Sequence, residues 1–218
     1  MPPGEPLTYL ERPAANRPGG LLVLHHGRGT DERDLLGLAD ALDPARRLRV
    51  VTPRAPLALP GSPGYHWYLV PRVGYPDPDT FQAARNALAE LHDRLWEESG
   101  IAPGRTVLGG FSMGAVMSYA MALGADRPPV AGIMAFSGFV PVVKGWEPAL
   151  EDRRGTRAFI AHGRADPVIE IGFGHRARDL IEASGLEVEY HESDVGHQID
   201  PAQLSAAVEW LDRTVRGD

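Results

Sequence analysis

The apolar residues of this chain alternate between short unbroken runs and longer stretches of helical character. An unbroken apolar run, which is typical of a buried strand, lies at residues 21–24, and further short β-prone runs lie at residues 48–52, 105–108, 130–136 and 157–161. Stretches with helical spacing or helix-forming composition lie at residues 31–42, 79–99, 115–123, 170–184 and 204–215. Residues 186–190 alternate between apolar and polar like an edge strand. Because strands alternate with helices, the pattern predicts an α/β fold, with a mostly parallel central sheet flanked by helices on both faces.

Two of the predicted helices carry signals at their ends. Asp31, with Asp34 three residues later, is typical of a helix N-cap followed by an acidic residue. The helix over residues 79–99 has the clearest periodicity and should end at Gly100, because glycine accepts the left-handed conformation that closes a helix. His92 lies on this helix and is expected to be at the surface or half-buried.

Residues 54–76 form the longest stretch without periodicity and are rich in proline. A loop of this length is often functional, for example as a lid, but it can equally be a surface loop packed on its own aromatic side chains. The stretch 141–155 is also irregular. No repeat or composition break divides the chain, so we expect residues 1–218 to form one domain.

Composition excludes several classes of function. Hydrophobic residues make up 43% and charged residues 23%, as in ordinary globular proteins, and no apolar run is long enough to span a membrane. The net charge of -7 argues against a nucleic-acid partner. The chain has no cysteine, so disulfides, thiolate nucleophiles and cysteine-ligated metals are excluded. The start of the chain lacks the pattern of a secretory signal, and we therefore expect a cytoplasmic protein without stable membrane association.

The segment Gly110-Phe111-Ser112-Met113-Gly114 lies between a predicted strand and a predicted helix. A serine at the tip of so tight a turn is strained, and glycines on both sides remove collisions with the neighbouring backbone. The turn also directs the Met113 N–H toward the space beside the Ser112 hydroxyl, where it could bind an oxyanion. The G-x-S-x-G pattern arises by chance in glycine-rich chains, but here the flanking strand and helix supply the context that a nucleophilic serine requires.

A nucleophilic serine needs an imidazole base and a carboxylate that orients it. His197 follows the last strand, and Asp166 follows the strand before it, which gives the order serine, acid, base. Asp194 is the rival acid, although we prefer to see it as a cap of its own loop. His162 and His191 are interpreted as structural hydrogen-bonding residues.

The loop after the first predicted strand is expected to supply a second oxyanion donor, the backbone N–H of Arg28, because Gly27 and Gly29 let this backbone approach a substrate. A phosphate site is the alternative, but the chain lacks the usual glycine-rich nucleotide motifs. His25 and His26 could suggest a metal; adjacent strand residues point to opposite faces, however, so we expect no metal here.

Several segments, in order along nearly the whole chain, resemble the phospholipase/carboxylesterase family, which includes the acyl-protein thioesterases. They are His26-Gly27-Arg28-Gly29, Gly110-Phe111-Ser112-Met113-Gly114-Ala115, Phe136-Ser137-Gly138-Phe139, His162-Gly163-Arg164-Ala165-Asp166-Pro167 and Gly196-His197. The resemblance implies an α/β-hydrolase domain without a large cap, a triad of Ser112, Asp166 and His197, and no cofactor. Trp67 and Tyr68 resemble an aromatic pair near the family's site. Arg28 stands where relatives often have a small or apolar residue, and its side chain could hold an anionic group or, as we prefer, simply face solvent.

These observations predict a serine carboxylesterase that cleaves small-molecule esters of short to medium acyl chains through an acyl-enzyme. Apolar residues beside strand ends or in the long loop are candidates for the acyl pocket, although each could belong to the core: Leu69, Val70, Phe139, Val140, Val168 and Ile169. A lysophospholipase or acyl-protein thioesterase is the enzymatic alternative, and a non-catalytic ligand-binding protein is the alternative from another class. Formation of a homodimer stays open.

Overall fold

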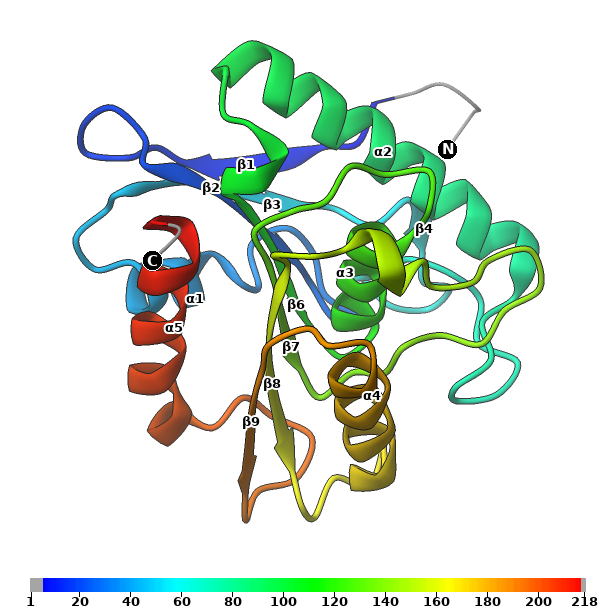
Figure 1. The fold of residues 1–218 in the computed structure, drawn as a ribbon. Helices are drawn as coiled ribbons and strands as arrows, with labels where there is room; N and C mark the ends of the chain where they lie inside the picture. Colours follow the sequence, from blue (N-terminus) through cyan, green and yellow to red (C-terminus); the bar gives the residue numbers. More distant parts are fainter. Residues whose placement is uncertain (1–5, 217–218) are drawn as a thin grey trace.

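The unbroken apolar runs form the strands of a central sheet. The structure is a computed structural model that describes residues 6–216. Its seven-stranded sheet has the order β1-β3-β2-β6-β7-β8-β9 (Figure 1). The strands are β1 (Tyr9–Arg12), β2 (Gly20–His25), β3 (Leu48–Pro53), β6 (Thr106–Phe111), β7 (Gly132–Phe136), β8 (Arg157–Gly163) and β9 (Val188–Ser193). Every pairing is parallel except β1 with β3, which confirms the predicted mostly parallel sheet.

Helices cover both faces of the sheet (Figure 1). They are α1 (Leu36–Leu42), α2 (Pro78–Ser99), α3 (Met113–Leu123), α4 (Ile171–Ala183) and α5 (Leu204–Arg216). Side chains of β2 alternate between two cores: Leu21 and Val23 pack with α2, α3 and α4, whereas Leu22 and Leu24 pack with α1 and α5. The alternation follows from the two-residue period of a strand, and it explains why both sides of each central strand are apolar.

The helix α2 ends as expected, whereas α1 begins later than expected. Gly100 closes α2 in the left-handed region with φ 67°. The predicted N-cap at Asp31 is wrong, because α1 begins at Leu36 and has no side-chain cap. Asp31 instead accepts a hydrogen bond from the Arg33 N–H, 2.8 Å away, in a turn before the helix.

Three further details differ from the sequence prediction or extend it. Strand β1 was not predicted; it is a short antiparallel edge strand. His92 is buried, not at the surface, because it lies on the core face of α2. The stretch 54–76 is largely irregular but contains the small antiparallel pair β4 (Leu57–Ala58) and β5 (Tyr65–His66).

Short 3-10 turns at Pro103–Arg105, Leu150–Asp152 and Pro201–Gln203 complete the described elements. Within residues 6–216, every helix is too short or too polar to cross a bilayer. The start of the chain, on which the expectation about a secretory signal rests, includes residues 1–5, which lie outside the described residues.

Candidate active site

Ser112 lies between β6 and α3 in a strained backbone conformation, with φ 56° and ψ −120°. The two glycines of the turn are required by close contacts. A Cβ atom on Gly114 would lie 1.9 Å from the His25 carbonyl oxygen, and one on Gly110 would lie 2.6 Å from the same oxygen. The turn can therefore raise the serine at the carboxyl end of β6, at the N-terminus of a helix, because the residues two positions before and after it carry no side chain.

The structure brings Ser112, His197 and Asp166 together from three loops at the same edge of the sheet. The Nε2 atom of His197 lies 2.8 Å from the Ser112 hydroxyl oxygen, and its Nδ1 atom lies 2.7 Å from Asp166 Oδ2. A carboxylate can only accept, so His197 carries its proton on Nδ1 and Nε2 accepts from the serine. In this tautomer the imidazole is ready to take the serine proton.

Asp166 is buried and fully engaged. Its Oδ1 atom accepts the backbone N–H groups of Val168 and Ile169 at 2.8 and 2.9 Å, while Oδ2 faces His197. Burial raises the pKa of this carboxyl, but the hydrogen bond from His197 and the two from the backbone outweigh burial and leave the pKa below its usual value. The carboxylate is thus held charged and aimed at the imidazole.

The rival carboxylate, Asp194, does not orient the imidazole. Its side chain is 87% exposed and makes an ion pair of 2.7 Å with Arg164. The ring of His197 instead packs on Phe111, with ring centroids 4.8 Å apart. This ring contact limits rotation of the imidazole, whose Nδ1 atom is held by Asp166.

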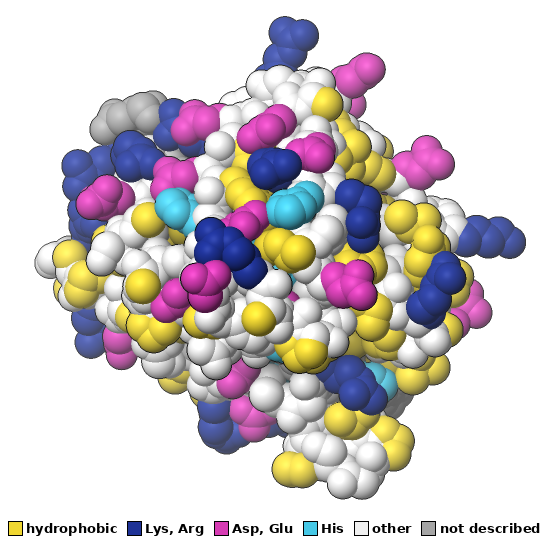
Figure 2. All heavy atoms as spheres, turned by 90° about the horizontal axis from the view of Figure 1, so that it is seen from below, with side chains coloured by type: hydrophobic (Ala, Val, Ile, Leu, Met, Phe, Trp, Pro, Cys, Tyr) yellow, Lys and Arg dark blue, Asp and Glu magenta, His cyan; other side chains and the backbone are white. Residues whose placement is uncertain are grey.

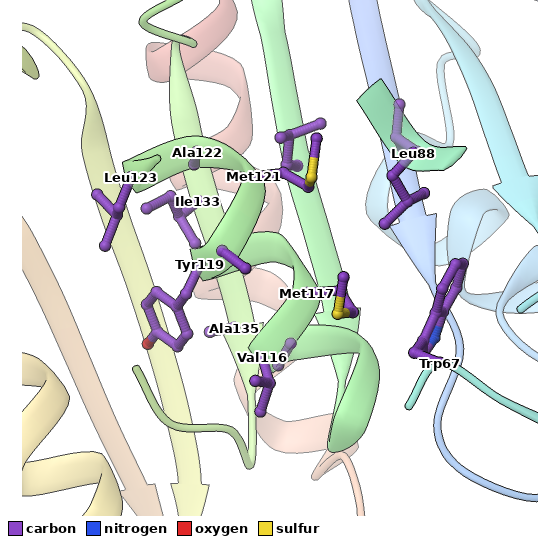
Figure 3. Close-up of a cluster of buried hydrophobic side chains, with 14 of the residues drawn as sticks. Trp67, Leu88, Val116, Met117, Tyr119, Met121, Ala122, Leu123, Ile133 and Ala135 are labelled. Carbon is purple, nitrogen blue, oxygen red and sulfur yellow. The ribbon is translucent and has the colours of Figure 1, made fainter. Parts of the chain in front are cut away.

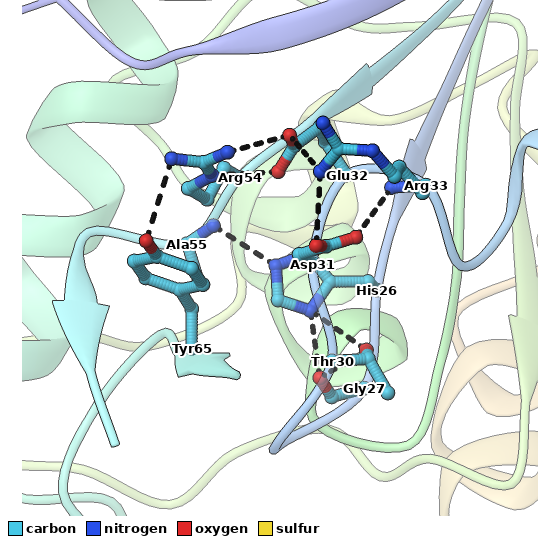
Figure 4. Close-up of polar contacts among 9 residues, drawn as sticks. All are labelled: His26, Gly27, Thr30, Asp31, Glu32, Arg33, Arg54, Ala55 and Tyr65. Atoms are coloured by element: carbon cyan, nitrogen blue, oxygen red, sulfur yellow. Dashed lines mark hydrogen bonds and ion pairs between the residues drawn. The ribbon is translucent and has the colours of Figure 1, made fainter. Parts of the chain in front are cut away.

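The loop that carries Arg28 is held on both sides. The buried Nε2 atom of His26 accepts the Ala55 N–H at 3.0 Å, so the ring carries its proton on Nδ1 and donates to the Gly27 carbonyl at 2.7 Å (Figure 4). On the other side of Arg28, the Gly29 N–H donates to the Tyr65 carbonyl at 2.8 Å. Burial lowers the pKa of His26, which keeps the ring neutral and able to accept. This role of His26 was not predicted from the sequence, where the adjacent histidines suggested only a metal site.

The predicted oxyanion donors belong to well-fixed segments. Met113 is the first residue of α3, and the first N–H groups of a helix have no acceptor within the helix. The partial positive charge at this helix end also favours an anion. Arg28 lies in the loop after β2, beside the Ser112 turn, and both residues line one cavity.

A cavity of about 610 Å³ opens at Ser112. Its lining is mostly apolar: Arg28, His66, Tyr68, Leu69, Val70, Pro71, Val73, Ser112, Met113, Phe139, Val168 and Ile169. Of the residues predicted to bind substrate or line the acyl pocket, six lie in this lining: Tyr68, Leu69, Val70, Phe139, Val168 and Ile169. His66, Pro71 and Val73 were not predicted, since nothing in an irregular stretch indicates which side chains face inward.

Two predicted pocket residues lie elsewhere. Trp67 is fully buried in the core against α2 and α3, where its indole N–H donates to the His26 carbonyl at 2.9 Å (Figure 3). Val140 lines a separate cavity of about 530 Å³, which shares only Phe139 with the cavity at the serine. Trp67 therefore supports the Arg28 loop from behind and does not face the site. Arg28 is exposed, in line with the expectation that its side chain faces solvent, and it also contributes to the lining of the cavity.

The face of the molecule at the carboxyl ends of the strands shows apolar side chains interspersed with arginines and carboxylates (Figure 2). Most of the large apolar side chains that are exposed belong to this region: Leu69, Val70, Val73, Tyr75, Val142 and Val168. The apolar surface thus continues from the cavity onto the rim around it.

The remaining histidines make structural contacts. His162 donates from Nε2 to the Ile169 carbonyl at 2.8 Å and thereby supports the turn that presents Asp166. His191 contacts Glu189 at 2.9 Å. His25 and His26 make separate contacts, and in the part of the chain that the structure describes no three His, Asp or Glu side chains gather in a way that could hold a metal ion.

The geometry of Ser112, His197 and Asp166 agrees with the protein family that the chain matches along its length. Residues 12–215 match the family model described as Phospholipase/Carboxylesterase. The chain belongs to the phospholipase/carboxylesterase family. An acyl-protein thioesterase 1 from Yarrowia lipolytica is 26% identical, over 97% of this chain and 99% of the relative. Membership in the family supports esterase or thioesterase activity.

Solved structures of esterases share the fold. The crystal structure of esterase PE8 superposes with a TM-score of 0.80 at 28% identity, covering 96% of this chain and all of the other. The Bacillus cereus carboxylesterase gives a TM-score of 0.82 at 23% identity, over 95% of this chain and 94% of the other. This family member therefore has the α/β-hydrolase fold expected from its motifs.

Proposed function

We propose that the protein is a serine carboxylesterase that cleaves its substrate through an acyl-enzyme. The continuous hydrogen bonds from Ser112 through His197 to Asp166 carry the proposal. These contacts give the serine a base within reach and give the base a fixed tautomer. A protein that only bound a ligand would have no need of all three groups in this geometry.

In the first half of the reaction, the Ser112 oxygen attacks the acyl carbon while His197 Nε2 takes the hydroxyl proton. Asp166 stabilises the resulting imidazolium without taking the proton. The negative charge on the former carbonyl oxygen is bound by the N–H groups of Arg28 and Met113, and removal of one such donor typically costs about 3 kcal/mol. The intermediate collapses when His197 passes the proton to the departing alcohol.

In the second half, water takes the place of the alcohol. His197 accepts a proton from the water, whose oxygen attacks the acyl carbon. The imidazolium then returns that proton to the Ser112 oxygen as the carboxylic acid leaves. No cofactor is needed, because the proton transfers balance within the triad.

The test is hydrolysis of 4-nitrophenyl butanoate by wild type, by Ser112→Ala and by Ser205→Ala, an exposed serine on α5 that serves as the control. We expect Ser112→Ala to lose at least about a thousandfold in kcat and Ser205→Ala to behave as wild type. A fluorophosphonate should label wild type and not Ser112→Ala. Absence of labelling in wild type would instead favour a non-catalytic binding protein.

We propose that the acyl group is short to medium, because the cavity at the serine is apolar but bounded by the segment that carries Tyr68 and Leu69. The second cavity, which begins on the other side of Phe139 and is lined by Val140, Val142 and Leu180, favours a longer chain as the second candidate. Such a chain would suit a lysophospholipid or an S-acylated protein.

A panel of acetyl, octanoyl and palmitoyl esters, each paired with its thioester, separates the two candidates. We expect kcat/KM to peak at the octanoyl ester or below. A steady rise to palmitoyl would contradict the short-chain proposal, and a consistent preference for the thioesters would favour the thioesterase alternative.

A further inference from the structure

Arg28 is the charged residue in an otherwise apolar or neutral cavity. Among the described residues that line it there is no carboxylate, and the other titratable side chains are His66 and Tyr68. Burial lowers the pKa of His66, and the positive charge of Arg28 lowers it further. The guanidinium therefore acts on the interior of the cavity, and it gives the mouth a positive charge.

The charge of Arg28 is free for a ligand. Within the described residues, no carboxylate lies at ion-pair distance from its guanidinium, although three acidic residues follow on the same loop. Two of these are engaged with arginines, Asp31 with Arg33 and Glu32 with Arg54 (Figure 4). The third, Asp34, accepts a hydrogen bond from the Thr30 hydroxyl.

The pairing of Glu32 with Arg54 is especially firm. Both oxygens of the carboxylate accept from the same guanidinium, at 2.6 Å each. Hydrogen bonds from Arg54 lower the pKa of Glu32 to about 2, so this carboxylate stays charged and paired. It does not need Arg28 as a counter-ion.

The backbone that carries this guanidinium is fixed beside the reaction. The His26 ring and the Tyr65 carbonyl hold the loop before and after Arg28. In the proposed reaction, the N–H of Arg28 binds the oxyanion, so its side chain extends from a point next to the acyl carbon. A group that it binds must lie within reach of this one side chain from the ester.

We propose that the substrate is an ester that also bears a carboxylate, and that the Arg28 guanidinium binds this carboxylate while the apolar lining takes the hydrocarbon part. The inference rests on the proposed esterase function and names its substrate class. A planar guanidinium matches a carboxylate with two parallel hydrogen bonds, which a lysine or a solvating water cannot do. Arg28 thus determines specificity through its side chain, separately from its backbone N–H.

The test compares matched pairs of esters. The carboxylate lies on the acyl side in mono(4-nitrophenyl) glutarate, with 4-nitrophenyl pentanoate as the neutral partner. It lies on the alcohol side in the butanoate ester of 4-hydroxyphenylacetate, with phenyl butanoate as the partner. For each pair, the measured quantity is kcat/KM of the anionic ester divided by that of the neutral ester, in wild type, Arg28→Gln and Arg28→Lys.

The control variant is Arg72→Gln. Arg72 belongs to the same surface, but its guanidinium stacks on the Tyr75 ring, 3.7 Å from the centroid, and it does not line the cavity. This variant therefore shows how removal of any nearby positive charge changes the kcat/KM ratio.

We expect Arg28→Gln to lower the ratio about tenfold in at least one pair, mainly through KM of the anionic ester, and Arg28→Lys to restore part of it. The pair that responds tells which side of the ester carries the carboxylate. Added NaCl should raise KM of that anionic ester in wild type more than in Arg28→Gln. Arg72→Gln should leave the ratio near that of wild type.

Two other results would overturn the inference. If Arg28→Gln lowers kcat/KM of both members of each pair equally, the side chain supports the loop and recognises no anion. If Arg72→Gln lowers the ratio as much as Arg28→Gln, the effect is general surface charge. Failure of the esterase proposal can be told apart from failure of this inference, because hydrolysis of the neutral esters would then persist in Ser112→Ala.

Discussion

Replacement of His92 by leucine should make the fold less sensitive to acid. His92 lies on the core face of α2, and neither ring nitrogen has a hydrogen-bond partner among the described residues. Its ring contacts those of His25 and Trp96, at centroid distances of 5.7 and 5.9 Å. Burial, and to a smaller extent the positive charge of Arg127, lower the pKa of His92 to about 3.

The sign of the effect follows from where the proton binds. In the unfolded chain His92 titrates near its ordinary value of 6.5, whereas in the fold it stays neutral to about 3. The unfolded state therefore binds more protons between these values, and the stabilisation present above pH 6.5 is lost as the pH falls. Between pH 7 and pH 5 this single ring accounts for about 2 kcal/mol of lost unfolding free energy.

The assay is urea unfolding of wild type and His92→Leu at pH 7 and pH 5. Leucine has a similar volume and suits a helix, so at pH 7 the variant should be as stable as wild type or more so. Between the two pH values it should lose about 2 kcal/mol less. Other buried histidines contribute to both proteins and largely cancel in this difference. Equal losses would refute the reasoning, because the His92 ring would then have to be hydrated or paired in the fold.

The remaining predictions concern the active site. Asp166→Asn should lower kcat on the order of a thousandfold or more, because an amide no longer fixes the His197 tautomer; unchanged ester turnover would contradict this. Gly114→Ala should lower unfolding free energy by at least about 2 kcal/mol, since its Cβ would overlap the His25 carbonyl, whereas Gly104→Ala, with open space around its Cβ, serves as the control in the same urea titration. His26→Leu should lower kcat about tenfold or more with a smaller change in KM, because the Arg28 loop loses both contacts of the ring. A tenfold rise in KM with kcat unchanged would contradict this, because it would indicate weaker substrate binding only.

The sequence was most informative where local chemistry leaves little choice. Short, β-prone apolar runs that alternate with helical stretches are typical of strands buried on both faces, and they predicted the parallel sheet. The serine turn was predictable because the G-x-S-x-G pattern is local in sequence, although the contacts that require its glycines come mainly from the distant His25 carbonyl. The three residues of the predicted triad each follow a strand, and strands of a parallel sheet end at one edge, so their meeting could be expected.

Features that depend on distant parts of the chain could not be predicted in this way. Trp67 resembles a site residue in sequence, but its place in the core depends on α2 and α3, which pack behind it. Whether Arg28 has an acidic partner depends on which neighbouring acids are already paired, and Glu32 is paired across 22 positions with Arg54. The burial of His92 could have been foreseen, because it lies four residues after Leu88 and three before Leu95, on the apolar side of the helix.

One stretch of chain, from His66 to Val73, contributes half of the cavity wall, while the reacting groups come from other loops. This stretch is tied to the start of α2, where the Leu69 N–H donates to the Thr80 hydroxyl and its carbonyl accepts the Asp77 N–H. The shape of this cavity can thus vary through substitutions at a few neighbouring positions, with Ser112, Asp166 and His197 left in place. Variants with new substrate ranges are best sought in this stretch, which is a compact target for directed evolution.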